Sequence, residues 1–269
     1  MEALTHDDID DFLAVAGGFL DADPVNHSVH LTTVDSALRG LRVPAALITL
    51  YDNGTLVGVA TRMQDRPLHV AAMPPAAAPL VAEALRGQDV DAVTGPLDRV
   101  EAFRTLWRTG GHETFRLKLY HLDELTIPDV PGRSRLAAEP DDDLITEWWT
   151  DFVAELDGLS RDDARDAMRG SRTMPAGHLI WEVDGVPVSW AAGTDPIAGV
   201  SRVGPVYTPP EHRRRGYAAA VTAAVSQWAY AAGADHVVLT ADFANPTANS
   251  VYRGIGFRHV SDWVEYRWS

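Results

Sequence analysis

The sequence predicts an α/β protein of the α+β type that is built from two similar halves. Two observations carry this prediction. Segments with apolar residues at helical spacing alternate with short apolar segments typical of strands, and the order helix, hairpin, strand, helix, strand, helix, strand occurs twice within 269 residues. The segment 127–140, which contains prolines and a glycine, separates the two occurrences. We therefore expect a structural duplication, to which one large α/β domain is the alternative.

The first half opens with a helix. Phe12, Ala16 and Leu20 fall on one face of the segment 7–20, which begins with aspartates. Asp52-Asn53-Gly54 stands between two apolar segments and is a hairpin signal. The elements predicted here are a helix at 7–20, strands at 45–51, 56–63 and 68–72, a helix at 76–86, a strand at 91–94, a helix at 97–108 and a strand at 115–122.

The second half repeats this order. Asp184-Gly185 marks its hairpin, and an acidic start marks its first helix. The predicted elements are helices at 141–156 and 161–169, strands at 178–183, 186–193 and 202–207, a helix at 216–232, a strand at 236–240, a helix at 247–254 and a strand at 257–268. The predicted domains are therefore residues 1–126 and 141–269, joined by a linker at 127–140.

The composition is that of a folded protein. Apolar residues make up 46% of the chain and charged residues 23%. No apolar run approaches the roughly 18 residues of a membrane helix, and the N-terminus MEALTHDDID is acidic, whereas a signal peptide begins with basic residues. We expect a cytoplasmic protein without a membrane partner.

Charge and residue usage exclude several classes of function. A formal net charge of −15 argues against nucleic acid or an anionic membrane as a partner. Cysteine is absent, which excludes disulfides, thiolate metal sites and cysteine nucleophiles, and Lys118 is the only lysine, which excludes a lysine-bearing phosphate loop. His27 and His30 lack matching further ligands, so we expect surface or capping residues there and no metal site.

The segment 201–221 carries the strongest chemical signal. An apolar strand ends at Tyr207, two prolines follow, and a basic turn containing Gly216 opens a helix. The first N–H groups of a helix have no partner within it, and its dipole is positive at that end, so such a turn can bind phosphate oxygens. Ala218 and Ala219 keep bulk away from a bound phosphate. A solvated basic turn is the alternative.

Residues 201–257 resemble the GNAT superfamily of acyl-CoA N-acyltransferases. Arg213, Gly216 and Ala218 fill the fixed positions of its phosphate-loop pattern, Gln/Arg-x-x-Gly-x-Gly/Ala. The resemblance implies two tandem GNAT-like domains, each with a mixed, mostly antiparallel sheet flanked by helices, and acetyl-CoA as co-substrate. It also implies that the pantetheine arm lies along Val206, Tyr207 and Thr208, and that the pyrophosphate is held by Arg213, Arg214, Arg215, Gly216, Tyr217, Ala218 and Ala219.

A second motif supports this resemblance. The stretch 239–257 is similar to the family's strand, its Asn-containing helix with a tyrosine, and its Gly-Phe ending. The resemblance implies that Asn245 and Asn249 form hydrogen bonds on the cofactor side and that Tyr252 is the general acid. Taken singly, Asn245 could cap the helix, Asn249 could be exposed and Tyr252 could be a core residue.

The implied activity is transfer of an acetyl group from acetyl-CoA to a primary amine by direct attack. Backbone N–H groups near Val206 and Tyr207 would polarise the thioester carbonyl. The candidate general bases are Glu155, Glu182 and Asp242, each of which could equally be a surface or capping carboxylate. The identity of the acceptor is open, and the helix pair at 141–169, with Trp148, Trp149, Glu155 and Asp157, is where we expect it to bind.

The first half lacks the phosphate-loop pattern. Its corresponding segment, 69–81, contains no Arg-x-x-Gly-x-Gly/Ala and places Pro79 where free N–H groups would be needed. We expect a degenerate copy that binds no CoA, with an unrelated α/β domain as the alternative. An acyl-CoA-binding regulator or scaffold without turnover is the rival function. The tandem layout also resembles the two-domain acetyltransferase of mycothiol biosynthesis, although no motif indicates that substrate, and the oligomeric state is open.

Overall fold

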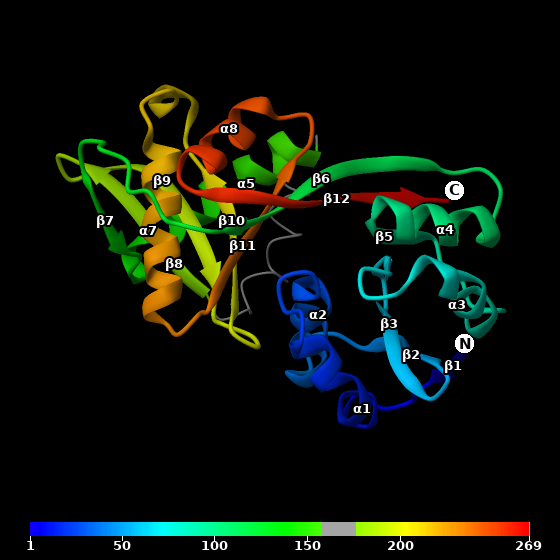
Figure 1. The fold of residues 1–269 in the computed structure, drawn as a ribbon. Coiled ribbons are helices and arrows are strands. Elements are labelled where there is room, and N and C mark those ends of the chain that lie inside the picture. The colour runs from blue at the N-terminus through cyan, green and yellow to red at the C-terminus, as the bar shows by residue number, and fades with distance from the viewer. Residues whose placement is uncertain (158–175, 269) are drawn as a thin grey trace. The chain divides into compact units, whose positions relative to one another are not determined.

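The computed structural model describes residues 1–157 and 176–268 (Figure 1). The chain forms two compact units. Unit 1 comprises Met1–Leu119, Ala241–Asn245 and His259–Ser269, and unit 2 comprises Tyr120–Thr240 and Pro246–Arg258. The units do not follow the chain order of the predicted domains, because the last eleven residues of the chain, 259–269, belong to unit 1 and not to unit 2.

Unit 1 is a mostly antiparallel sheet with helices on both faces. Its strand order is β1-β2-β3-β4-β5-β12, and only the pair β4 and β5 is parallel among these described neighbours. The elements are β1 (Glu2–Thr5), α1 (Ile9–Asp21), α2 (Ser28–Leu38), β2 (Pro44–Asp52), β3 (Thr55–Met63), β4 (Leu68–His69), η1 (Pro75–Ala77), α3 (Ala78–Ala84), β5 (Ala92–Pro96), α4 (Leu97–Trp107), most of β6 (His112–Leu122) and most of β12 (Phe257–Arg267).

The two faces of the unit 1 sheet are covered differently. Alternate residues of β2, such as Ile48 and Leu50, pack with α3 and α4 in a dry core that includes Phe103. The opposite face meets α1 and α2, where buried polar pairs replace part of the apolar packing. The His30 ring lies 2.9 Å from the Thr61 hydroxyl there, within hydrogen-bond distance.

Unit 2 has the same topology. Its strand order is β7-β8-β9-β10-β11, antiparallel except for the parallel pair β10 and β11. The elements are β7 (Arg133–Leu136), η2 (Glu139–Asp141), α5 (Asp142–Asp157), β8 (Ala176–Val183), β9 (Val186–Thr194), β10 (Val200–Tyr207), η3 (Pro210–His212), α7 (Tyr217–Ala231), β11 (His236–Asp242) and α8 (Pro246–Gly254). In both units a helix connects the two parallel strands, which supports the duplication.

Two helices sandwich the central strands of unit 2. On one face α5 packs Ile145 and Trp148 against Trp190 of β9 and Tyr207 of β10. On the other face α7 lies across β8, β9 and β10 (Figure 1). Glycines allow this close approach, because a Cβ at Gly177 would meet the Trp228 ring of α7 at 2.3 Å.

Unit 1 receives its last strand from the C-terminal half of the chain, and unit 2 receives the end of β6 from the N-terminal half. β12, at the C-terminus, pairs with β5 of unit 1 in an antiparallel register that runs from Trp263↔Pro96 to Arg267↔Ala92. The end of β6, by contrast, belongs to unit 2. The C-terminal tail therefore completes the sheet of the N-terminal unit.

The structure differs from the prediction at the linker and at one further helix. The predicted linker contains the strand β7, which pairs with β8 from Arg133↔Glu182 to Leu136↔Leu179. The helix α2 was not predicted, because its buried face is built from Ser28, His30 and Ser36 as well as Leu31 and Val34 and so lacks an apolar stripe. The predicted helix at 161–169 lies outside the described residues. In the described parts of the chain, no helix combines the length and apolar character that crossing a bilayer requires.

Candidate active site

The parallel strands β10 and β11 separate part-way along their length. Their register runs from Val200↔His236 to Val203↔Leu239 and then ends, whereas β10 stays paired with β9 as far as Tyr207↔Trp190. A register shift between Val203 and Val206 accompanies the separation. Residues 204–207 therefore have one edge on β9 and a second edge without a strand partner, where backbone N–H and C=O groups can bind a ligand.

The free end of β10 is held in place by buried polar contacts. The Ser189 hydroxyl of β9 donates to the Tyr207 carbonyl at 2.9 Å and lies 2.8 Å from the Thr208 hydroxyl. Ser189 is fully buried. These contacts keep Val206, Tyr207 and Thr208 extended beyond the point where β11 leaves.

A tight basic loop connects this strand end to α7. Arg214 and Gly216 both have a positive φ, of 62° and 84°, and Gly216 is the N-cap of α7. The conformation of Gly216 is left-handed, which favours glycine. A Cβ at Gly216 would also meet Cγ2 of Val130 at 2.8 Å, so the loop lies closely against that side chain.

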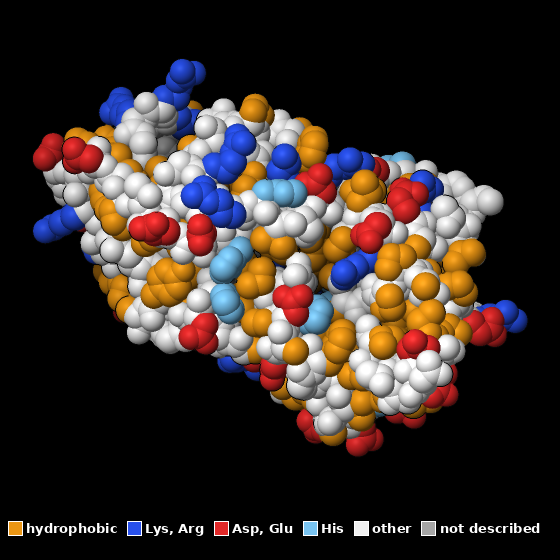
Figure 2. Space-filling view, viewed as in Figure 1, with side chains coloured by type: hydrophobic (Ala, Val, Ile, Leu, Met, Phe, Trp, Pro, Cys, Tyr) orange, Lys and Arg blue, Asp and Glu red, His pale blue; other side chains and the backbone are white. Residues whose placement is uncertain are grey.

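The start of α7 presents unpaired backbone donors. The first helical hydrogen bond runs from the Ala220 N–H to the Gly216 carbonyl at 3.0 Å, and no side chain caps the helix. Within the described part of the chain, the N–H groups of Tyr217, Ala218 and Ala219 make no hydrogen bond. Blue basic side chains project from the surface over the loop before α7 (Figure 2), where the sequence has only arginines. This geometry suits phosphate oxygens.

Arg213 differs from its two neighbours. Its Nε donates to the Thr208 carbonyl at 2.9 Å, and its Nη2 donates to both carboxylate oxygens of Glu155 at 2.8 and 2.9 Å. Arg214 and Arg215 are exposed and make no ion pair in the described part of the chain. Arg213 thus ties the loop to α5, while the next two arginines remain available to an anion.

The second motif forms the end of β11 and the helix α8. Asn245 is exposed, and its N–H donates to the Asp242 carbonyl at 3.1 Å, directly before Pro246 opens α8. Asn249 is buried, and its Oδ1 accepts a hydrogen bond from the Tyr120 hydroxyl at 2.8 Å. The partner Tyr120 was not predicted, because it is 129 positions away in the sequence.

Tyr252 carries a phenol without a fixed partner. Its ring makes an edge contact with Phe257 at 6.2 Å between centroids, and the side chain is partly exposed. In the described residues its hydroxyl forms no hydrogen bond. Desolvation of the hydroxyl raises the pKa of Tyr252 to about 12, so the phenol is protonated at neutral pH.

The candidate bases have different surroundings. Glu155 is paired with Arg213, and Glu182 is buried, with one carboxylate oxygen 2.6 Å from Nε of Arg135. Asp242 accepts from the Ala244 N–H at 2.8 Å in the loop before α8. Burial, Glu155 and Asp151 raise the pKa of Tyr207, and both carboxylates belong to α5, which packs against Tyr207.

A family comparison agrees with this geometry. Residues 142–257 match the model of the acetyltransferase (GNAT) family. This part of the chain is a GNAT-family domain. The match includes α5, β10, α7 and α8, and membership supports an acyltransferase.

Solved structures share the fold of the whole chain. One is a GCN5-related N-acetyltransferase from Sphaerobacter thermophilus, with 17% identity, a TM-score of 0.62 and coverage of 99% of this chain and 95% of that chain. A second, from Kribbella flavida, has 20% identity, a TM-score of 0.58 and coverage of 88% and 94%. A third is a tandem GNAT protein from the clavulanic acid biosynthesis pathway, with 17% identity, a TM-score of 0.59 and coverage of 98% and 97%. A search of curated protein sequences found no match.

Unit 1 has a segment at the position that corresponds to the end of β10 and the loop before α7. Ala72-Met73-Pro74-Pro75 corresponds to Tyr207-Thr208-Pro209-Pro210, since each follows the parallel strand and leads into a 3-10 turn. In unit 1, α3 follows that turn directly, whereas residues 213–216 separate η3 from α7. The Ala72 N–H donates to Nε2 of His30 at 3.2 Å. The loop is thus absent, and the strand amide is already bonded.

The prediction that His27 and His30 are surface or capping residues was wrong in part. His27 is at the N-cap position of α2, but both rings are buried, and Nδ1 of His27 lies 3.1 Å from the Leu20 carbonyl. Burial lowers the pKa of both rings, that of His30 well below the usual value. Among the described residues, no group of three or more His, Asp or Glu side chains could hold a metal ion.

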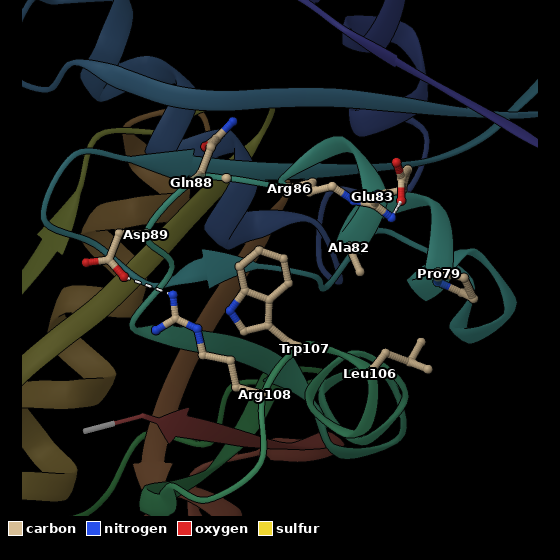
Figure 3. Close-up of a pocket in the computed structure, with 10 residues that line it drawn as sticks. Pro79, Ala82, Glu83, Arg86, Gln88, Asp89, Leu106, Trp107 and Arg108 are labelled. Atoms are coloured by element: carbon tan, nitrogen blue, oxygen red, sulfur yellow. Dashed lines mark hydrogen bonds and ion pairs between the residues drawn. The ribbon is translucent and has the colours of Figure 1, made fainter.

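A surface hollow in unit 1 is lined by none of the predicted site residues. Its volume is about 630 Å³, and it lies between α3 and α4 (Figure 3). Trp107 forms part of its wall, with the ion pairs Arg86–Glu83 and Arg108–Asp89 on either side. Because both arginines already have acidic partners at the surface, the hollow offers no strong charge to a ligand.

Proposed function

We propose that the protein is an N-acetyltransferase that moves the acetyl group of acetyl-CoA to a primary amine in the GNAT domain. The observation that carries the proposal is the separation of β10 from β11 directly before a left-handed glycine and the uncapped start of α7. The free edge of β10 and the start of α7 would then bind the same ligand. Such a ligand has hydrogen-bonding groups for the strand edge and, next to them, phosphates for the helix start. Family membership supplies the chemical class.

The residues present fit acetyl-CoA. Arg214, Arg215 and the N–H groups of 217–219 would hold the pyrophosphate, and the small side chains Ala218 and Ala219 leave room for it. The free edge of Val206, Tyr207 and Thr208 would bond to the pantetheine amides. Arg213 would act as a positioning residue, because its guanidinium is bound to Thr208 and Glu155. Asn249 would hold α8 in place through its hydrogen bond with the Tyr120 hydroxyl. Asn245 is exposed and directly precedes that helix.

Acetyl-CoA supplies an activated acyl group and a thiolate leaving group. A β10 amide at Val206 or Tyr207 would donate a hydrogen bond to the thioester oxygen, which favours attack by a neutral amine held nearby. Tyr252 would donate its proton to the departing sulfur. Its pKa of about 12 keeps it in the acid form throughout the physiological range.

The acceptor side favours a cationic amine. Asp151 and Glu155 lie one turn apart on α5, and both act on the Tyr207 hydroxyl at the end of β10. Carboxylates near the reaction centre attract an ammonium and can accept its proton, directly or through water. Glu155 is the preferred base, because of the three candidates it is the one that acts on the Tyr207 hydroxyl at the free end of β10.

Unit 1 is proposed to be a degenerate copy that binds no CoA. It lacks a counterpart of residues 213–216, Pro79 stands in the first turn of α3, and His30 accepts the hydrogen bond of the strand amide at Ala72. Each change removes a different part of the cofactor site.

The rival is an acyl-CoA-binding regulator without turnover. A test is the release of free CoA thiol from acetyl-CoA in the presence of a panel of amines, which includes a polyamine, an aminoglycoside, amino acids and a peptide with a free N-terminus. Acetylated product, identified by mass spectrometry, is expected for at least one amine and is expected to be lost when Arg214 and Arg215 are both changed to Gln. Tight acetyl-CoA binding with no product from any amine would support the rival.

A further inference from the structure

A few arginine side chains have no acidic partner. In residues 1–157 and 176–268 most arginines form an ion pair or donate a side-chain hydrogen bond, as Arg86 does to Glu83 and Arg116 does to Glu113. Six described arginines have side chains with neither an ion pair nor a hydrogen bond: Arg42, Arg62, Arg66, Arg99, Arg214 and Arg215. In a chain with a net charge of −15, unpaired arginines are informative, since acids to pair them are plentiful.

Two of these arginines are in the loop before α7, where the proposed function places a pyrophosphate. Three others gather at one end of the β2–β3 hairpin in unit 1. Arg42 precedes β2, Arg62 is next to the last residue of β3, and Arg66 lies in the turn to β4. The Gln64 N–H donates to the Val43 carbonyl at 2.9 Å, which joins the segments that carry them.

No ion pair compensates the charge of these three side chains within residues 1–157 and 176–268. Nε of Arg62 is buried and has no hydrogen-bond partner. Burial and the nearby Arg66 guanidinium lower the pKa of Arg42, so two cations are close enough to repel each other. Asp65, in the same turn, forms no ion pair within the described residues. A buried unsatisfied donor and clustered like charges both cost free energy unless an anion compensates them.

We infer that Arg42, Arg62 and Arg66 form an oxyanion site on unit 1, separate from acetyl transfer, that takes a small ligand with phosphate or carboxylate groups. Guanidinium groups suit both ligands, because their forked donors match two oxygens of one anion. The anion would offset the charge of the partly exposed Arg62 side chain, whose buried Nε has no hydrogen-bond partner. The Arg42 and Arg66 guanidinium groups would be bridged by the same anion.

Calorimetric titration with inorganic phosphate, and separately with citrate, tests this inference. The protein is the full chain with Arg214 and Arg215 changed to Gln, so that the loop before α7 does not contribute. Saturable binding of at least one probe is expected, and the probe that binds identifies the source as phosphate or carboxylate. Arg62→Gln or Arg66→Gln should weaken that binding by about tenfold or more, as expected for loss of a charge-assisted hydrogen bond.

Arg86→Gln is the matched control, because Arg86 is an exposed arginine of the same unit that is paired with Glu83. It should leave the affinity unchanged. Arg66 is exposed, so Arg66→Gln should keep the fold, and its circular dichroism spectrum would check this. No saturable binding of either probe, or equal affinity in the Arg66→Gln protein, would overturn the inference.

Discussion

Side chains of the two sequence motifs have different partners in the folded chain. Arg213 is bound to Thr208 and Glu155, Asn249 is bound to Tyr120, and the Tyr252 hydroxyl has no hydrogen bond among the described residues. The motifs indicated which residue types would gather near the strand end. They could not indicate Glu155 or Tyr120 as partners, because those residues come from distant segments with no pattern of their own.

Tyr252 is the residue on which the proposed chemistry depends most. Tyr252→Phe removes only the hydroxyl, so we expect kcat at saturating acetyl-CoA to fall by about 10²-fold or more, the usual contribution of a general acid. Stability should change little, since that hydroxyl forms no hydrogen bond in the described part of the chain. Tyr230→Phe, on the partly exposed Tyr230 of α7, is the control and should keep full activity. Equal kcat for Tyr252→Phe and the native protein would remove Tyr252 from the mechanism.

His30 gives unit 1 a pH-dependent stability. Burial lowers the pKa of His30 well below its unfolded value, so the unfolded chain takes up a proton as the pH falls through about 6.5 while the folded chain does not. The free energy of unfolding should therefore decrease below that pH, by up to about 1.4 kcal/mol per pH unit for this one proton. Urea denaturation should show a shallower decrease for His30→Gln, which cannot titrate. Parallel curves for the two proteins would contradict this account of His30.

At the scale of elements, local signals predicted most helices and strands correctly. The hairpin around Asn53 and Gly54, the strand that ends at Tyr207 and the helix that follows Gly216 all occur where expected. The register shift of β10 was not predicted, although Gly204-Pro205 inside an apolar strand is a signal for one. The strand β7 was missed because it is short and contains Arg133 and Arg135 in place of an apolar run.

The turn into α7 requires glycine for two separable reasons. Gly216 has a positive φ. In addition, a Cβ at this position would lie 2.8 Å from Cγ2 of Val130. Gly216→Ala should raise the Kd for acetyl-CoA by about tenfold or more, since a left-handed non-glycine residue costs about 1–3 kcal/mol and the added methyl displaces the loop. Gly233→Ala is the matched control, because Gly233 follows α7, also has a positive φ and has open space around its Cβ. Equal Kd values for both variants and the native protein would show that the loop geometry does not determine cofactor binding.

At the scale of the whole molecule, the duplicated order of elements was predictable but the exchange of the last strands was not. Alternating residues in the C-terminal tail predicted a strand. Its partner β5 is set by topology, and a period-2 pattern contains no information about which strand lies alongside. This is why the predicted division at residues 126 and 141 differs from the two compact units.

The C-terminal tail should stabilise the N-terminal unit. Trp268 is buried in the unit 1 core, its ring 6.4 Å from Phe103, and its indole N–H donates to the Arg108 carbonyl. Trp268→Ala should lower the free energy of unfolding by about 3–5 kcal/mol, measured by urea denaturation. Phe115→Ala, at a largely exposed aromatic residue of the same unit, should cost much less. Similar costs for the two changes would show that the tail does not contribute to that core.

The most direct test of the account is the number of acetyl-CoA molecules bound by one chain. In the proposed function the chain has one open site, between the separated strand β10 and the start of α7, and no second site in unit 1. Calorimetric titration should therefore give one site per chain, whose affinity falls by about tenfold or more when Arg214 and Arg215 become Gln. Two equivalent sites per chain, or one site with unchanged affinity in that variant, would contradict the account.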